Sequence, residues 1–173
     1  FTGSTTVGRS IMRQAADHMK SVTLELGGKS PNIILDDADL ETAAHGALFG
    51  TFFHGGQVCT SGTRVLVPEH LYNDFLEIMV EGAKKIVVGD PTHEDTTMGP
   101  IATEAQYKKT RKYVELGRQE GARCVFGGER PQGAEIGYYH QPTIFRDVHN
   151  EMRIAQEEVF GPVVCVIPYA GGD

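Results

Sequence analysis

The chain has 173 residues and a formal net charge of −7 at pH 7, with acidic and basic residues interspersed along it. The length suffices for one sizeable hydrophobic core, and the basic residues form only short groups such as Lys84-Lys85 and Lys108-Lys109, which argues against nucleic acid as a partner. No apolar run approaches the roughly 20 residues that would span a bilayer, so we also expect no membrane contact.

Apolar periodicity and turn residues predict strands that alternate with helices along the whole chain. In chain order, the predicted elements are a strand end at 1–3, a helix over 4–20, strands over 22–26 and 33–35, a helix over 39–54, a strand over 63–67, a helix over 69–87, a loop over 88–102, a helix over 103–120, strands over 123–126 and 142–145, a short helix over 151–156 and a strand over 163–167. This alternation favours an α/β fold in which helices cover a parallel or mixed sheet.

The three cysteines stand in different surroundings. Cys165 lies within a continuous apolar run and Cys124 precedes two apolar residues, which suits small buried residues without reactivity. Cys59 instead follows a Gly55-Gly56 turn and has small polar neighbours, so we expect an accessible thiol that could act as a nucleophile. An odd number of separated cysteines also favours a reducing, cytoplasmic compartment over a disulfide framework, and no Cys or His spacing suggests a metal site.

The stretch from Thr23 to Pro31 contains a glutamate at the end of a predicted strand. Glu25 stands between two leucines, and we expect this setting to desolvate its carboxylate partly, which suits a general base. An exposed glutamate at a strand edge is the alternative that composition alone favours. The tripeptide 28–30 resembles part of a phosphate-binding loop, but that motif requires a glycine where Thr23 stands, so we reject this interpretation.

Two further stretches could contact a cofactor. Glu158, Phe160 and a Gly-Pro pair precede the last apolar run, and carboxylates often bind ribose hydroxyls while aromatic side chains often flank a flat ring. Gly3 and Ser4 lead into the first predicted helix, whose N-terminus is a natural anion site. Taken singly, each stretch is better explained by an ordinary helix end, or by a capped helix that binds nothing.

Together, the four stretches resemble the aldehyde dehydrogenase superfamily, whose members carry similar motifs in the same order. The matching motifs are Phe1–Ser4, Leu24–Lys29, Gly56–Cys59 and Glu157–Pro162. Glu25 precedes Cys59 by 34 residues, which is similar to the usual separation in the family. The resemblance covers essentially the whole chain.

The resemblance implies the activity and the catalytic residues. It makes Cys59 the nucleophile and Glu25 the general base of a reaction that oxidises a small-molecule aldehyde to a carboxylic acid through a cysteine thioester. It also implies NAD or NADP as the cofactor, with Leu26 and Gly27 lining the nicotinamide pocket.

The resemblance implies further cofactor contacts at both ends of the chain. Glu158 would bind the ribose of the nicotinamide half, with Phe160 near the nicotinamide ring. Gly3 and Ser4 would lie close to the cofactor, and Ser4 would lie near its phosphates.

The resemblance also divides the chain, with residues 1–26 in a Rossmann-like dinucleotide-binding domain and 27–173 in the catalytic domain. The first residue is not methionine, and the oxyanion asparagine of the family would lie before it. We therefore expect a segment of a homodimeric or homotetrameric enzyme, inactive by itself. The alternatives are a relative that passes the thioester to coenzyme A, which Glu25 argues against, and a non-catalytic structural or binding protein on the same fold.

Overall fold

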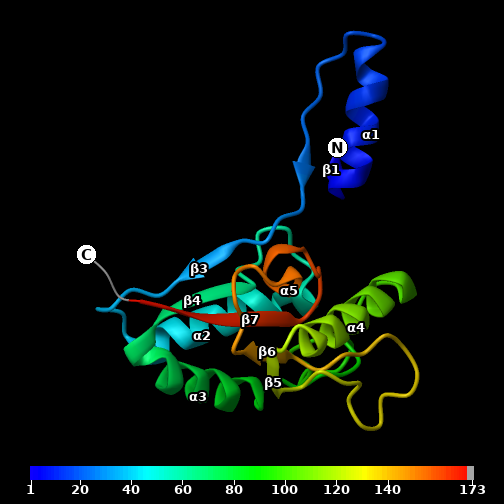
Figure 1. Cartoon of the computed structure of the whole chain (residues 1–173). Helices are drawn as coiled ribbons and strands as arrows, with labels where there is room; N and C mark the ends of the chain where they lie inside the picture. Colours follow the sequence, from blue (N-terminus) through cyan, green and yellow to red (C-terminus); the bar gives the residue numbers. More distant parts are fainter. Residues whose placement is uncertain (171–173) are drawn as a thin grey trace.

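The computed structural model describes residues 1–170 and shows an α/β protein (Figure 1). Its five-stranded sheet has the order β3-β4-β7-β6-β5, in which β5 runs antiparallel to β6 and the other neighbours are parallel. These strands are β3 (Pro31–Ile33), β4 (Arg64–Pro68), β5 (Arg123–Phe126), β6 (Thr143–Arg146) and β7 (Val163–Tyr169). The predicted fold class, a mixed sheet covered by helices, is confirmed.

Helices cover both faces of the five-stranded sheet. They are α2 (Leu40–Phe52), α3 (Tyr72–Ala83), α4 (Glu104–Gln119) and α5 (Arg153–Gln156). Val164 and Val166 of β7 join the core on the side of α2 and α3, whereas Val163, Cys165 and Ile167 join the core on the side of α4 and α5. Successive side chains of a strand point to opposite faces, so the cover on both faces explains why this segment of β7 is apolar throughout.

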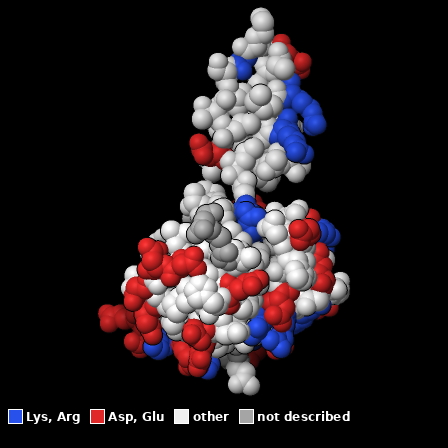
Figure 2. Space-filling view, turned by 60° about the vertical axis from the view of Figure 1, so that its left-hand side comes forward, with Lys and Arg blue, Asp and Glu red and all other residues white. Residues whose placement is uncertain are grey.

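A smaller lobe stands apart from this body (Figures 1 and 2). It consists of β1 (Thr2–Gly3), α1 (Thr5–Ala16) and β2 (Glu25–Leu26), and its two strands form a separate parallel sheet. Ser4 caps α1 by accepting a hydrogen bond from the N–H of Val7 (3.3 Å). Gly8 of α1 approaches the side chain of Leu26 so closely that a Cβ at Gly8 would lie 2.7 Å from it.

The element order predicted from the sequence is confirmed, but two strands differ at their ends. The strand predicted over 22–26 comprises only its last two residues, because β1 offers just Thr2 and Gly3 as pairing partners. The strand predicted over 33–35 lies two residues earlier, because Pro31–Ile33 pair in register with β4. In both cases a partner distant in sequence sets the boundary. Among residues 1–170, no helix is long and apolar enough to cross a membrane.

The placement of the core predicts the effects of two matched substitutions. Ile144 in β6 is fully buried, whereas Ile33 on the edge strand β3 keeps 56% of its surface exposed. We expect Ile144→Ala to lower the free energy of unfolding by about 2–5 kcal/mol, because it leaves a cavity beneath α2 and α3. Ile33→Ala should lower it by only about 0.5 kcal/mol. Urea titration of the chain measures both values, and equal losses would contradict this placement of the core.

Candidate active site

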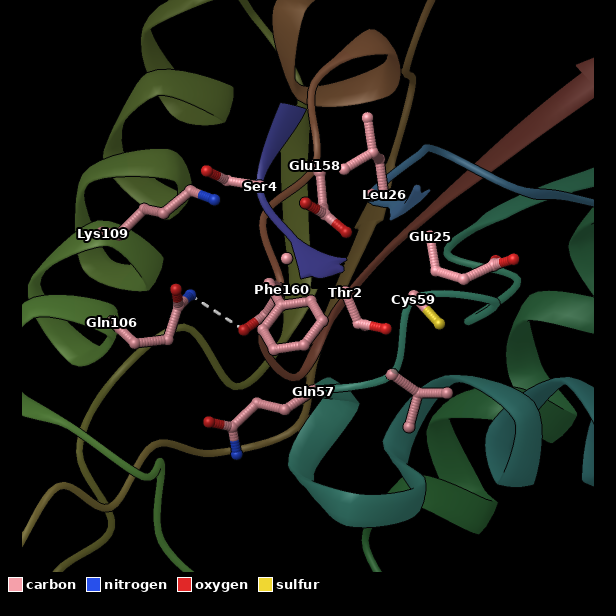
Figure 3. Close-up of a pocket in the computed structure, with 13 residues that line it drawn as sticks. Thr2, Ser4, Glu25, Leu26, Gln57, Cys59, Gln106, Lys109, Glu158 and Phe160 are labelled. Atoms are coloured by element: carbon pink, nitrogen blue, oxygen red, sulfur yellow. Dashed lines mark hydrogen bonds between the residues drawn. The ribbon is translucent and has the colours of Figure 1, made fainter. Parts of the chain in front are cut away.

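A cavity of about 420 Å³ lies where the lobe meets the body (Figure 3). All eight site residues expected from the sequence line it, namely Gly3, Ser4, Glu25, Leu26, Gly27, Cys59, Glu158 and Phe160. Five unexpected residues complete its wall, namely Thr2, Gln57, Val58, Gln106 and Lys109. Gln106 and Lys109 stand three apart in the helix predicted from the sequence and so share a face, but the sequence does not show what that face meets.

The cavity lies between two sets of strand ends. Gly3 and Leu26 are the last residues of β1 and β2, so the lobe faces the cavity with the carboxyl ends of its strands. Cys59 precedes β4 and Phe160 precedes β7, so the body faces it with the amino ends of its strands. Residues that are far apart in the sequence converge here because the two sheets meet end to end.

A left-handed turn presents Cys59 to the cavity. Residues 54–56 have φ values of 51°, 62° and 70°, a conformation that the two glycines among them adopt without strain. Gln57 ties this turn to the segment before α4, because its Oε1 accepts a hydrogen bond from the N–H of Ala102 (3.0 Å). Cys59 is exposed, and Figure 3 shows it on the same side of the cavity as Glu25.

The other two cysteines are covered by the core. Cys165 is buried and Cys124 is half-buried. Burial raises the pKa of Cys165 to about 11, and it also raises the pKa of Cys124 above its ordinary value. The difference in exposure expected from the sequence is therefore confirmed, and it leaves Cys59 as the accessible thiol of the described chain.

Glu25 is more exposed than its apolar sequence neighbours suggested. It pairs with Thr2 in the lobe sheet, while the adjacent Leu26 packs against Gly8 beneath α1. The expectation that the leucines desolvate its carboxylate was wrong, because neighbours along a strand alternate between faces and do not cover one another. What the fold gives Glu25 is a place on the cavity wall near Cys59.

Glu158 lies across the backbone of Gly27. A Cβ at Gly27 would collide with the Glu158 carboxylate, so this approach requires glycine. Gln106 of α4 holds the segment that carries Glu158, because its Nε2 donates hydrogen bonds to the carbonyls of Val159 (2.7 Å) and Phe160 (2.8 Å). Phe160 has a φ of 58°, which is uncommon for a residue other than glycine, so these bonds hold a strained backbone beside the cavity.

The turn that presents Cys59 and the segment that carries Glu158 are in contact through backbone atoms. A Cβ at Gly56 would collide with the carbonyl of Gly161, and a Cβ at Gly161 would collide with the hydroxyl of Thr110 on α4. No side chain therefore separates the two segments, and a shift of one moves the other.

A charged network fixes the Glu158 segment from the side of α5. Arg153 donates two hydrogen bonds to Glu157 (2.7 and 3.1 Å), and Tyr113 donates one to the same carboxylate (2.5 Å). These bonds lower the pKa of Glu157 to about 2, while burial and the bond to Glu157 raise the pKa of Tyr113 to about 12. Glu120 caps α5 by accepting hydrogen bonds from the N–H groups of Arg153 (2.9 Å) and Ile154 (3.2 Å).

Charge is mixed along the cavity wall. The N-terminus of α1 opens on the cavity at Ser4, and the positive end of a helix dipole attracts anions. Lys109 adds a positive charge from α4, whereas Glu25 and Glu158 add negative charges from the lobe and the body. Within residues 1–170, no group of three or more His, Cys, Asp and Glu side chains could hold a metal ion.

Comparisons of the sequence place the chain among dehydrogenases. The profile of the Aldehyde dehydrogenase family matches residues 1–173. A betaine aldehyde dehydrogenase of Brucella anthropi is 50% identical over 175 residues, which cover 100% of this chain and 36% of that protein. A putative aldehyde dehydrogenase of Staphylococcus saprophyticus is 49% identical, over 98% of this chain and 36% of that protein.

Comparisons of the structure give solved aldehyde dehydrogenases. An NAD+ complex of an aldehyde dehydrogenase from Bacillus cereus matches with a TM-score of 0.95 and 47% identity, over 98% of this chain and 34% of that chain. A mutant of aldehyde dehydrogenase C from Pseudomonas syringae, in complex with NAD+ and octanal, matches with a TM-score of 0.96 and 45% identity, over 98% and 35%. The chain thus spans about a third of the length of these relatives.

Exposure predicts which thiol of the chain is alkylated first. Treatment with substoichiometric iodoacetamide near neutral pH should modify Cys59 at least about tenfold faster than Cys124 or Cys165, because only an accessible thiolate reacts readily. Mass spectrometry of the digested chain locates the adduct. Preferential labelling of Cys124 or Cys165 would contradict the account of Cys59.

The Glu157 network predicts an acid-sensitive contribution to stability. The pKa of Glu157 is lowered from 4.5 to about 2 in the folded chain. The stability that the network contributes is therefore fully present above about pH 4.5 and is lost as the pH falls toward 2. The difference in free energy of unfolding between wild type and Glu157→Gln should therefore shrink over this range. Urea titrations at several pH values measure it, with the exposed Glu151→Gln as control. A difference that does not change with pH would refute the network.

Proposed function

The chain belongs to the aldehyde dehydrogenase family, and from this premise we propose that it carries the nucleophile and the general base of an enzyme that oxidises aldehydes to carboxylic acids with NAD+ or NADP+. The observation that supports this most is the single cavity lined by Cys59, Glu25 and Glu158, which come from three separate parts of the sequence. Because the relatives are about three times as long, we propose that these residues act within a longer protein, called the whole enzyme below, and that the chain alone is inactive.

The cavity suits the nicotinamide half of the cofactor. The Glu158 carboxylate, held over Gly27, offers oxygens that can accept hydrogen bonds from ribose hydroxyls, and a side chain at residue 27 would fill that space. The N-terminus of α1, after Gly3 and Ser4, offers backbone N–H groups to a phosphate. Phe160 supplies an aromatic side chain beside the place proposed for the nicotinamide ring.

Cys59 begins the proposed reaction as a thiolate. Its Sγ adds to the aldehyde carbon, and the resulting oxyanion can accept a hydrogen bond from the Cys59 backbone N–H. A nicotinamide held beside Phe160 and Glu158 would supply the hydride acceptor, and loss of a hydride from that carbon would leave a thioester on Cys59. Glu25 then takes a proton from a water molecule while the water oxygen bonds to the thioester carbon. The carbon–sulfur bond breaks, which frees the carboxylic acid and the Cys59 thiolate.

The position of Glu25 distinguishes this function from the alternatives. A carboxylate on the same side of the cavity as Cys59 can activate water, so water rather than coenzyme A is the acyl acceptor that we propose. A structural or binding protein would need neither an accessible Cys59 nor a carboxylate beside it.

We further propose a domain division and an assembly. The separate sheet of the lobe supports the assignment of residues 1–26 to a dinucleotide-binding domain and of 27–173 to a catalytic domain. Exposed apolar side chains on α2, directly after it and on β3, namely Phe49, Phe53 and Ile33, support contacts with other parts of the whole enzyme or with a second copy in a homodimer or homotetramer. Three free thiols support a cytoplasmic location.

Replacement of Glu25 tests the general-base role. Glu25→Gln in the whole enzyme keeps the size of the side chain but removes the base. We expect a burst of about one NADH per Cys59, followed by turnover about 100- to 10,000-fold slower than in the wild type, because hydrolysis of the thioester then lacks its base. Rapid-mixing absorbance at the NADH band separates the two phases. Glu135→Gln, at an exposed glutamate, is the control, and undiminished steady turnover of Glu25→Gln would refute the role.

A further inference from the structure

The amine of Lys29 is buried without a hydrogen-bond partner among residues 1–170. The residue as a whole is half-buried, but its Nζ has no contact with solvent. A buried ammonium without a partner costs stability, and an unpaired buried polar atom calls for an explanation. Lys29 does not line the cavity, so the reaction derived above leaves it without a role.

The strand register places Lys29 in the layer between the sheet and α4 and α5. Pro31, Arg64 and Cys165 stand side by side in β3, β4 and β7, and in-register residues of parallel strands point to the same face. Cys165 belongs to the core cluster that contains Ile154 of α5. Lys29 is two residues before Pro31, and both Cys165 and Arg64 act on its charge, so its side chain lies in this same layer.

Four groups from different elements act on the charge of Lys29. They are Cys165 of β7, Arg64 of β4, Lys109 of α4 and Glu158, which follows α5. Burial lowers the pKa of Lys29 most, Arg64 and Lys109 lower it further, and Cys165 and Glu158 oppose them. The Cys165 thiol is uncharged near pH 7, because burial raises its pKa to about 11. Glu158 is therefore the counter-charge of this group of four at neutral pH.

We propose that Lys29 is a positioning residue for Glu158, whose buried amine holds the carboxylate against Gly27 in the orientation that accepts the ribose hydroxyls of the cofactor. The inference rests on the proposed function, because it assumes that Glu158 binds ribose. Gly27 precedes Lys29 by two residues and touches the Glu158 carboxylate, so the backbone that anchors the amine also forms the surface beneath the carboxylate. In this proposal, the buried amine lowers the stability of the folded chain and, in return, orders the cofactor site.

Cofactor binding by the whole enzyme gives the first test. Lys29→Met keeps the length of the side chain and removes its charge. We expect the dissociation constant for NAD+ to rise about tenfold, within the range of couplings between interacting residues, while alkylation of Cys59 keeps its rate. Lys29→Arg should restore part of the affinity. Lys112→Met, at an exposed lysine of α4, is the matched control and should leave the affinity unchanged.

A double-mutant cycle tests whether Lys29 acts through Glu158. In a Glu158→Gln background, Lys29→Met should cause no further loss of NAD+ affinity, because the carboxylate that it positions is already gone. An equal loss in both backgrounds would show that Lys29 acts elsewhere and would overturn the proposal. If Lys29→Met does not fold, Lys29→Gln replaces it in the same cycle.

Stability of the 173-residue chain gives a readout that does not depend on cofactor binding. Because the pKa of Lys29 is lowered in the folded chain from 10.5, the wild type bears a penalty at neutral pH that fades as the pH rises toward 10.5. Lys29→Met should therefore shift the urea midpoint upward near pH 7 and shift it less near pH 10.5. An equal shift at both pH values would contradict a buried charged amine.

The outcomes separate this proposal from the proposed function. A wild-type whole enzyme that binds neither NAD+ nor NADP+ would refute the proposed function itself. Wild-type binding together with unchanged NAD+ affinity in Lys29→Met would overturn only the role of Lys29, and would leave its amine as a buried charge of the core. Weaker cofactor binding combined with a more stable chain is the result that we expect, since a purely structural lysine would not give it.

Discussion

Contact between the backbones of Gly56 and Gly161 sets the geometry of the candidate site. The carbonyl of Gly161 occupies the space that a Cβ of Gly56 would need. The turn that presents Cys59 and the segment that carries Glu158 therefore cannot move independently. Two glutamines extend this contact to α4, since Gln57 binds the segment before the helix and Gln106 binds the carbonyls beside Glu158.

The two sheets contribute opposite strand ends to the cavity, and this explains the division of chemical roles. Ligands of parallel α/β sheets usually bind at the carboxyl ends of the strands, and the lobe follows that rule with Gly3 and Leu26. The body instead offers the amino ends of β4 and β7, where its loops carry Cys59 and Glu158. In the proposed reaction, the lobe supplies the general base Glu25 and the body supplies the nucleophile Cys59, while residues of both bind the cofactor. The proposed reaction consequently requires precise contact between lobe and body.

Local patterns sufficed for the order of the elements and for the accessible thiol, because both depend on neighbours in the sequence. The glycine turn before Cys59 correctly predicted an exposed thiol, and the apolar run around Cys165 correctly predicted a buried one. Features that depend on distant partners were not predictable. Leu26 beside Glu25 packs against Gly8 of α1 and does not cover the carboxylate. The face of α4 with Gln106 and Lys109 lines the cavity only because α4 packs beside the segment that carries Glu158. The buried amine of Lys29 likewise follows from strand register, which no local pattern fixes.

Trapping the acyl intermediate tests the central claim most directly, namely that Cys59 and Glu25 perform successive steps in one cavity. The whole enzyme with Glu25→Gln is mixed with NAD+ and a simple aldehyde, quenched in acid and analysed by peptide mass spectrometry. The account predicts an added acyl mass on the peptide that contains Cys59, present only when NAD+ is supplied. An acyl mass on another residue, or NADH formation with no covalent adduct on Cys59, would contradict it.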